Sequence, residues 1–140
     1  MTALTGGCAC GAIRYAVSAE PMAVSHCHCA DCRRATGAPF ITWMTLPSEG
    51  FRLTDGTPAV FESSPGVERR FCGACGTTLF YGAVAHPEEI DVSAASLDDP
   101  EAVTLDDHLW SGAALSWVKM ADGLPRLERA HWDHGYPKRS

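Results

Sequence analysis

The seven cysteines of this 140-residue chain constrain its fold more than any other feature. Because seven is an odd number, they cannot all pair as internal disulfides, and clustered cysteines in a reducing compartment are more often metal ligands or catalytic thiols. They form three compact groups: an N-terminal pair (Cys8, Cys10), a central triple (Cys27, Cys29, Cys32) and a C-terminal pair (Cys72, Cys75).

The spacing within each group suits a metal ion. Thiols two residues apart on an extended strand point to the same side, and a Cys-x-x-Cys turn aims two sulfurs at one point. Thiolate-rich tetrahedral sites favour zinc or iron–sulfur clusters. We therefore predict zinc, and an iron–sulfur cluster at the central triple is the alternative.

Seven ligands divide naturally into four and three. A structural zinc site is closed by four protein ligands, whereas a catalytic site keeps three and leaves one position open. This favours a closed site made by the two pairs and an open site at the central triple. Spacing alone leaves two alternatives: Cys8 and Cys10 could join part of the triple, or His26 or His28 could complete four ligands there.

The remaining sequence predicts a mainly β fold of short antiparallel strands with little helix, in one domain over residues 1–140. Alternating or β-branched segments separated by Gly, Pro and Asp turns predict short strands. These segments are residues 13–17, 40–46, 59–62, 68–71, 78–81 and 90–92. Residues 31–36 are expected to form a helical turn or two, and residues 111–120 fit either a short helix or a strand.

Charge and hydropathy limit the partners. No apolar run approaches the ~18 residues of a membrane helix, and the N-terminus lacks the pattern of a signal peptide, so we expect a cytoplasmic protein without membrane contact. The net charge of −6 becomes more negative when thiols ionise around zinc, which disfavours nucleic-acid binding. The signatures of α/β-hydrolases, P-loop kinases and dinucleotide-binding dehydrogenases are missing from the sequence. The oligomeric state is left undetermined.

Three ordered motifs resemble one family. The segments 7–15, 27–34 with 37–39, and 70–77 resemble the successive cysteine motifs of the glutathione-dependent formaldehyde-activating enzymes, also called the GFA or centromere-protein-V family. The tail segments 97–100, 108–110 and 122–125, with Trp117, are also similar to this family. The resemblance implies a β tent pinned by two zinc ions. It assigns Cys8, Cys10, Cys72 and Cys75 to a structural zinc, and Cys27, Cys29 and Cys32 to a catalytic zinc.

The resemblance also implies a carbon–sulfur lyase that joins a thiol such as glutathione to a small carbonyl such as formaldehyde, or catalyses the reverse. Three thiolates leave their zinc with a net negative charge, so it would activate a carbonyl poorly but would accept a soft fourth ligand. Metal coordination deprotonates such a thiol, and the thiolate is the nucleophile. The alternative is a non-catalytic, zinc-stabilised module that binds a protein, with the central site closed or empty of metal.

Residues near the cysteines allow both functional and structural interpretations. Arg33 and Arg34 directly follow the last cysteine of the triple, so they could offset its charge or clamp a substrate carboxylate, or they could be solvated. His28 lies between two proposed ligands, so it could shuttle protons, donate to a sulfur, or simply pack with its side chain turned away. His108 belongs to the similar tail segment and could approach the site.

For the other aromatic, histidine and acidic residues the structural interpretation is favoured. Four aromatic residues could wall a substrate cavity but more often form core: Phe40, Trp43, Trp110 and Trp117. Three histidines are expected at the surface: His86, His131 and His134. Four aspartates are expected in solvated loops: Asp98, Asp99, Asp106 and Asp107.

Overall fold

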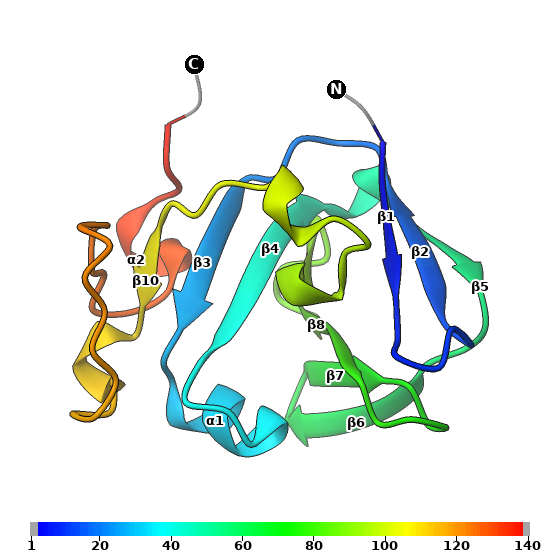
Figure 1. The fold of residues 1–140 in the computed structure, drawn as a ribbon, viewed down its shortest axis with the longest axis horizontal. Helices are drawn as coiled ribbons and strands as arrows, with labels where there is room; N and C mark the ends of the chain where they lie inside the picture. Colours follow the sequence, from blue (N-terminus) through cyan, green and yellow to red (C-terminus); the bar gives the residue numbers. More distant parts are fainter. Residues whose placement is uncertain (1–2, 139–140) are drawn as a thin grey trace.

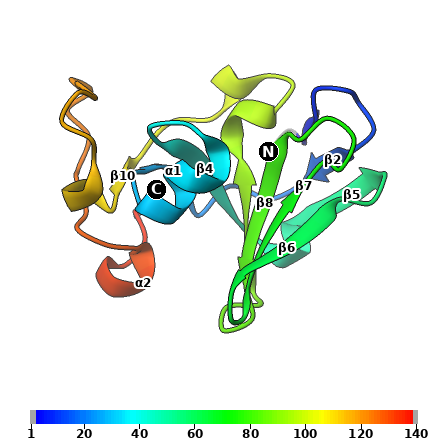
Figure 2. The same ribbon diagram turned by 90° about the horizontal axis from the view of Figure 1, so that it is seen from below.

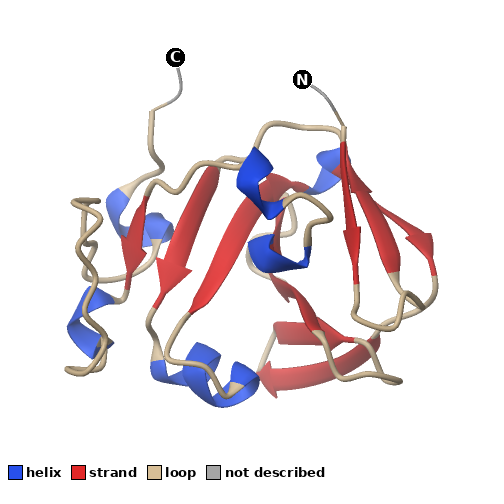
Figure 3. Ribbon diagram, in the orientation of Figure 1, coloured by secondary structure: helices blue, strands red, loops and turns tan. Residues whose placement is uncertain are grey.

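The computed structural model describes residues 3–138, and strands dominate it (Figure 3). This confirms the predicted mainly β class. The strands described are β1 (Leu4–Gly7), β2 (Arg14–Val17), β3 (Ala23–Cys27), β4 (Ile41–Pro47), β5 (Phe51–Asp55), β6 (Ala59–Ser64), β7 (Val67–Phe71), β8 (Thr78–Ala83), β9 (Glu89–Ser93) and β10 (Asp107–Leu109). The helical segments described are α1 (Ala30–Thr36), α2 (His131–His134) and the short 3₁₀ turns η1 (Ser48–Gly50), η2 (Ala94–Ser96), η3 (Pro100–Ala102) and η4 (Ser111–Ala113).

The strands form two sheets. The small sheet has the order β1-β2-β5, and the large sheet has the order β10-β3-β4-β9-β8-β7-β6. In Figure 1 the small sheet stands at one side of the molecule, and β10, β3 and α2 lie at the other. Neighbouring strands pair antiparallel, as predicted, with one exception among the described residues: β10 runs parallel to β3.

The main core lies between the two sheets. Successive side chains of a strand point to opposite faces, so alternate residues of β4, β8 and β9 turn toward the small sheet. Tyr15 of β2 meets Phe80 of β8 edge to face, with ring centroids 5.6 Å apart, and Met44 of β4 and Val92 of β9 are fully buried in the same cluster.

The opposite face of the large sheet carries a second, smaller cluster. It is built around Cys27, Cys32 and Trp43, with Tyr81 packed against it. The register pairs Tyr81 of β8 with Asp91 of β9, and Asp91 with Thr45 of β4. This face therefore gathers sulfur, aromatic and acidic side chains from strands far apart in the sequence. Figure 2 gives the view from below, with β6, β7 and β8 side by side and α1 nearer to β4 and β10.

Candidate metal centres and their cavity

The N-terminal and C-terminal pairs meet at one point. The sulfurs of Cys8, Cys10, Cys72 and Cys75 all lie within 4.8 Å of one another. Cys10 Sγ is 3.6 Å from Cys8 Sγ and 3.8 Å from Cys72 Sγ. A tetrahedral zinc with Zn–S bonds of about 2.3 Å places its sulfurs about 3.8 Å apart, so the donor set fits zinc. Because one pair follows β1 and the other follows β7, a metal here would join the two sheets.

The backbone turns of both pairs donate hydrogen bonds to sulfur. The N–H of Ile13 donates to Cys8 Sγ at 3.2 Å, and the N–H of Cys75 donates to Cys72 Sγ at 3.4 Å. Burial would raise the pKa of Cys8, but the hydrogen bond from Ile13 and those with Cys10 and Cys72 lower it, which favours the thiolate that binds a metal. The second turn closes through Gly76, whose φ of 81° lies in the left-handed region that glycine tolerates best.

Thr77 connects the two turns. Its hydroxyl oxygen accepts a hydrogen bond from the N–H of Ala9 at 3.1 Å and lies 3.2 Å from Cys75 Sγ. Hydrogen bonds from the side chain and then the backbone of Thr77 lower the pKa of Cys75 to about 5. At neutral pH Cys75 is therefore a thiolate ready to bind a cation.

The central triple forms a separate group where β3 meets α1. Cys27 ends β3, Cys29 caps the N-terminus of α1, and Cys32 lies in the first turn of that helix. Cys27 Sγ and Cys29 Sγ are 3.5 Å apart, and the N–H of Cys32 donates to Cys29 Sγ at 3.3 Å. All three sulfurs lie within 4.8 Å of one another, again a spacing that fits zinc.

This second group contains three donors and no more among the residues that the structure describes. The two histidines considered as a fourth ligand have other partners: His26 bonds to the hydroxyl of Thr42, at 2.8 Å, and His28 bonds to His108. The N-terminal pair belongs to the other group. The structure thus brings the seven cysteines together as four and three, and both groups could hold a metal ion.

Arg69 and Trp43 set the electrostatics of the triple. Arg69 is 8% exposed, and its Nη2 lies 3.7 Å from Cys32 Sγ. Hydrogen bonds from Cys27 and Cys29, then from Trp43, and the charge of Arg69 hold the pKa of Cys32 far below its usual value. The pKa of Cys27 is raised in turn, first by its hydrogen bond with Cys29, because crowded sulfurs resist carrying several negative charges.

A cavity of about 180 Å³ opens beside the central triple, and we call it the cysteine cavity. Its acidic lining residues are Glu89, Asp91 and Asp133, and its aromatic ones include Trp43, Tyr81, Trp110, Trp132 and Tyr136. Burial raises the pKa of Asp91 to about 7, although a hydrogen bond from the Thr45 hydroxyl to Oδ1 opposes the shift. Asp91 is therefore partly protonated near neutral pH.

Residues 130–136 close one side of the cysteine cavity. His131 anchors this segment: its Nε2 lies 2.9 Å from Oδ2 of Asp107, whose Oδ1 accepts a hydrogen bond from the hydroxyl of Ser25. Both oxygens of Glu89 accept hydrogen bonds from this segment, one from the Trp132 indole at 2.6 Å and one from the Tyr136 hydroxyl. The predictions of a surface His131 and a solvated Asp107 were wrong, because each buried group satisfies the other.

His28 points away from the sulfurs on either side of it. Its Nε2 lies 2.9 Å from Nδ1 of His108, and Nε2 of His108 lies 2.8 Å from Oδ2 of Asp122. Burial, and then the neighbouring His108, lower the pKa of His28 to about 4, so it is neutral at neutral pH. Phe40 packs on His28 with ring centroids 5.3 Å apart. Neither histidine lines the cysteine cavity, which favours the packed interpretation of His28.

Other residues singled out from the sequence lie elsewhere. Arg34 lines a separate groove between α1 and strands β6–β8, and Arg33 is half-buried outside the cysteine cavity. Trp117 is 67% exposed, so it forms neither core nor cavity wall, whereas Trp43 and Trp110 both line the cavity. Arg69, Tyr81 and Asp91 were not among the residues expected at the site, because their only signal in the sequence was their place in predicted strands.

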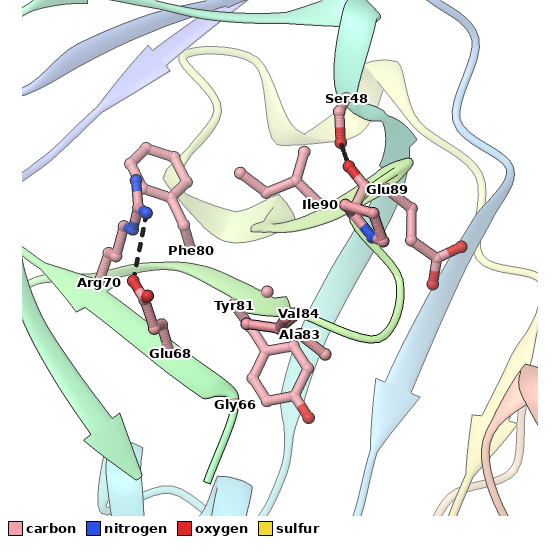
Figure 4. A pocket seen from close by; sticks show the side chains of 12 residues that line it. Ser48, Gly66, Glu68, Arg70, Phe80, Tyr81, Ala83, Val84, Glu89 and Ile90 are labelled. Atoms are coloured by element: carbon pink, nitrogen blue, oxygen red, sulfur yellow. Dashed lines mark hydrogen bonds and ion pairs between the residues drawn. The ribbon is translucent and has the colours of Figure 1, made fainter. Parts of the chain in front are cut away.

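A further hollow of about 230 Å³ lies among β7, β8 and β9 (Figure 4). Arg70 and Glu68 form an ion pair at 3.2 Å on one side of it, and the Ser48 hydroxyl donates to the Pro87 carbonyl at 2.8 Å on the other. Its lining contains no cysteine among the described residues, so it offers no comparable metal site.

Fold and site together define a mainly β protein with two cysteine groups that could each hold a metal ion. The model of the family described as "Glutathione-dependent formaldehyde-activating enzyme" matches residues 3–113. The chain belongs to this family, which is the one its motifs resemble. None of the described helices combines the length and apolar character needed to cross a membrane.

Individual relatives support the same family assignment. A Halomonas elongata protein named after the same enzyme is 30% identical over 98% of this chain and 90% of its own length. A Schizosaccharomyces pombe protein named only as a lyase is 29% identical over 72% of this chain and 73% of its own length. A crystal structure of a Rhodobacter sphaeroides protein shares the fold, with a TM-score of 0.54, 23% identity and coverage of 88% and 98% of the two chains. Family membership and the lyase-named relative make this chain an enzyme of the carbon–sulfur lyase type.

Proposed function

We propose that this enzyme adds a thiol to a small carbonyl such as formaldehyde, or catalyses the reverse, at a zinc ion held by Cys27, Cys29 and Cys32. One observation carries the proposal: three converging sulfurs, without a fourth donor in the described residues, form part of a cavity wall. Catalytic zinc sites keep such an open position. The family name, which joins glutathione and formaldehyde, supports a thiol and a carbonyl as the two reactants.

A zinc ion bound there would supply an open position that holds the substrate thiol as its thiolate. In the addition the thiol gives up its proton, a carbon–sulfur bond forms to the carbonyl carbon, and the C=O π pair moves to oxygen, which takes up a proton. The product is a hemithioacetal, and the reverse step breaks the same bond.

Residues of the chain assist each part of this reaction. Arg69 offsets the negative charge of the three sulfurs from the side of Cys32. Asp91, with Oδ1 occupied by Thr45, keeps Oδ2 to hold or give up the proton that the substrate oxygen needs. The aromatic wall excludes water from the reacting atoms.

We assign the group of Cys8, Cys10, Cys72 and Cys75 to a second zinc with a structural role. Four sulfurs leave no position for a substrate, and the turns that carry them belong to different sheets.

X-ray absorption at the zinc edge tests the proposal. When glutathione is added to the zinc-loaded protein, average sulfur coordination should rise, and Cys29→Ala should abolish the rise while the fold and one zinc persist. Carbon-13 NMR should show faster hemithioacetal formation with the wild type than with Cys29→Ala. If none of several thiols adds sulfur to zinc, the position at the central triple is closed to thiols, and the thiol addition proposed there is wrong.

A further inference from the structure

The cysteine cavity is small for a tripeptide thiol. Its volume of about 180 Å³ is below the roughly 300–1,000 Å³ of typical small-molecule sites. Part of its wall comes from residues 130–136, which lie beyond the segment that the family model matches. The space therefore fits a short thiol together with formaldehyde, and most of a tripeptide would have to remain outside it.

The charge of the lining is negative. Glu89, Asp91 and Asp133 contribute carboxyl groups, and the lining includes no Lys or Arg within residues 3–138. Arg69 contacts the lining at Cys32 and Tyr81, where its one positive charge offsets the sulfurs. Both oxygens of Glu89 are fixed by hydrogen bonds from Trp132 and Tyr136, so this carboxylate cannot turn away. A thiol that brought its own carboxylate would meet these groups and the thiolates, and unpaired like charges in an enclosed site repel strongly.

The aromatic walls favour the opposite charge. Trp43 and Tyr81 lie with ring centroids 6.0 Å apart, and the Tyr81 ring already holds one cation, the Arg69 guanidinium 5.0 Å from its centroid. Trp132 and Tyr136 line the side made by the C-terminal segment, where His86 stacks on Trp132. Ring faces attract ammonium groups, and the attraction grows when the cation is shielded from water. Carboxylates among aromatic rings thus form a site whose chemistry suits an organic cation.

We propose that the thiol accepted by the cysteine cavity is a small aminothiol, whose sulfur takes the open position at the central triple and whose ammonium group lies between the acidic and aromatic side chains. This rests on the function proposed above, and it names the class of thiol. Thiols that carry a carboxylate near the sulfur bind weakly.

Calorimetric titration of the zinc-loaded protein tests this choice with three short thiols: cysteamine (cationic), 2-mercaptoethanol (neutral) and 3-mercaptopropionate (anionic). At pH 7 cysteamine should bind roughly tenfold or more tightly than 3-mercaptopropionate, and also more tightly than glutathione. Asp133→Asn should shrink the ratio between cysteamine and 3-mercaptopropionate several-fold. Because the same thiols are compared in both proteins, their different intrinsic acidities cancel. Glu128→Gln, an exposed carboxyl outside the cavity, is the matched control and should leave the ratio unchanged.

The outcomes separate this proposal from the one it rests on. If all thiols add sulfur to the zinc and 3-mercaptopropionate or glutathione binds as tightly as cysteamine in both proteins, the aminothiol proposal is wrong and the proposed function stands. If no thiol adds sulfur to the zinc, both are wrong.

Discussion

At the scale of single residues, Arg69 is the cation that the structure places in contact with the central triple. Its guanidinium is buried between the Cys32 sulfur and the ring of Tyr81, whose centroid is 5.0 Å away. A buried charge is stable only when it is paired, and here the partner is the Cys32 sulfur. Arg69 therefore serves the central triple more than the surrounding sheet.

Arg69→Gln should weaken zinc binding at the central triple. The substitution removes a hydrogen bond from a charged group, an interaction of about 1.5–3 kcal/mol, so the zinc dissociation constant of this site should rise roughly tenfold or more. Arg69→Lys should restore part of the loss. Arg70→Gln, at an ion pair with Glu68 away from the sulfurs, is the control. Competition with a chelator, read as zinc retained per chain, measures the effect, and an unchanged affinity in Arg69→Gln would contradict it.

The arginines next to Cys32 illustrate a limit of local reasoning. Arg33 and Arg34 follow the cysteine directly, but a helix turns successive side chains in different directions, and neither lines the cysteine cavity. Arg69 comes from β7, whose pairing with β8 places it opposite Tyr81. Such a contact depends on sheet register, which the sequence of β7 alone does not specify.

At the scale of elements, the attachment of α2 depends on one buried pair. His131 bonds to Asp107 of β10, and Asp107 also accepts a hydrogen bond from Ser25 of β3. Burial alone would raise the pKa of Asp107, but the hydrogen bonds from His131 and Ser25 outweigh it, and the pKa is lowered. The ionised form of Asp107 is therefore the one that stabilises the fold.

This lowered pKa gives stability a defined pH dependence. The contribution of Asp107 is complete above the usual Asp pKa of about 4 and is lost as the pH falls below it toward the lower native pKa. Asp107→Asn should reduce the free energy of unfolding at pH 7 by about 3 kcal/mol and flatten its decline in acid. Urea denaturation from pH 7 to pH 3 measures both, with the exposed Asp55→Asn as the control. If the free energy of unfolding falls with pH in parallel for Asp107→Asn and wild type, the pair of Asp107 and His131 is not coupled to folding.

Most of the described strands could be predicted from their apolar or alternating pattern, whereas β1, β3, β5 and β10 were missed. Six predicted segments correspond to β2, β4, β6, β7, β8 and β9. β10 has only three residues, and two of them, the buried Asp107 and His108, are polar residues whose sequence pattern is typical of a turn. Their burial is compensated by Ser25, His131 and Asp122, which lie far away in sequence. Residues 111–120 form η4 followed by irregular backbone, not the helix or strand considered.

At the scale of the whole molecule, the two cysteine groups occupy different structural positions. One joins the small sheet to the large sheet, and the other lies on the outer face of the large sheet beside a cavity. The grouping of the cysteines could be predicted because each pair or triple is local in sequence. The cavity could not, because its walls come from β4, β8, β9 and residues 130–136, which only the complete fold brings together.

These positions predict that two cysteine substitutions differ in their effect on stability. Cys72→Ala removes a ligand from the group that joins the sheets, and loss of a structural metal can exceed ~4 kcal/mol for one substitution. We expect one zinc to be lost and the melting temperature to fall by on the order of 10 °C for a chain of this size. Cys29→Ala should lose the other zinc and all thiol binding, while its melting temperature stays within a few degrees of wild type, because the sheets remain joined. Zinc content and thermal unfolding, measured side by side on the freshly purified variants, decide the assignment. A Cys72→Ala protein that keeps both zinc ions and its melting temperature would show that the four-sulfur group is not structural. A large fall in the melting temperature of Cys29→Ala would show that the central triple has the structural role.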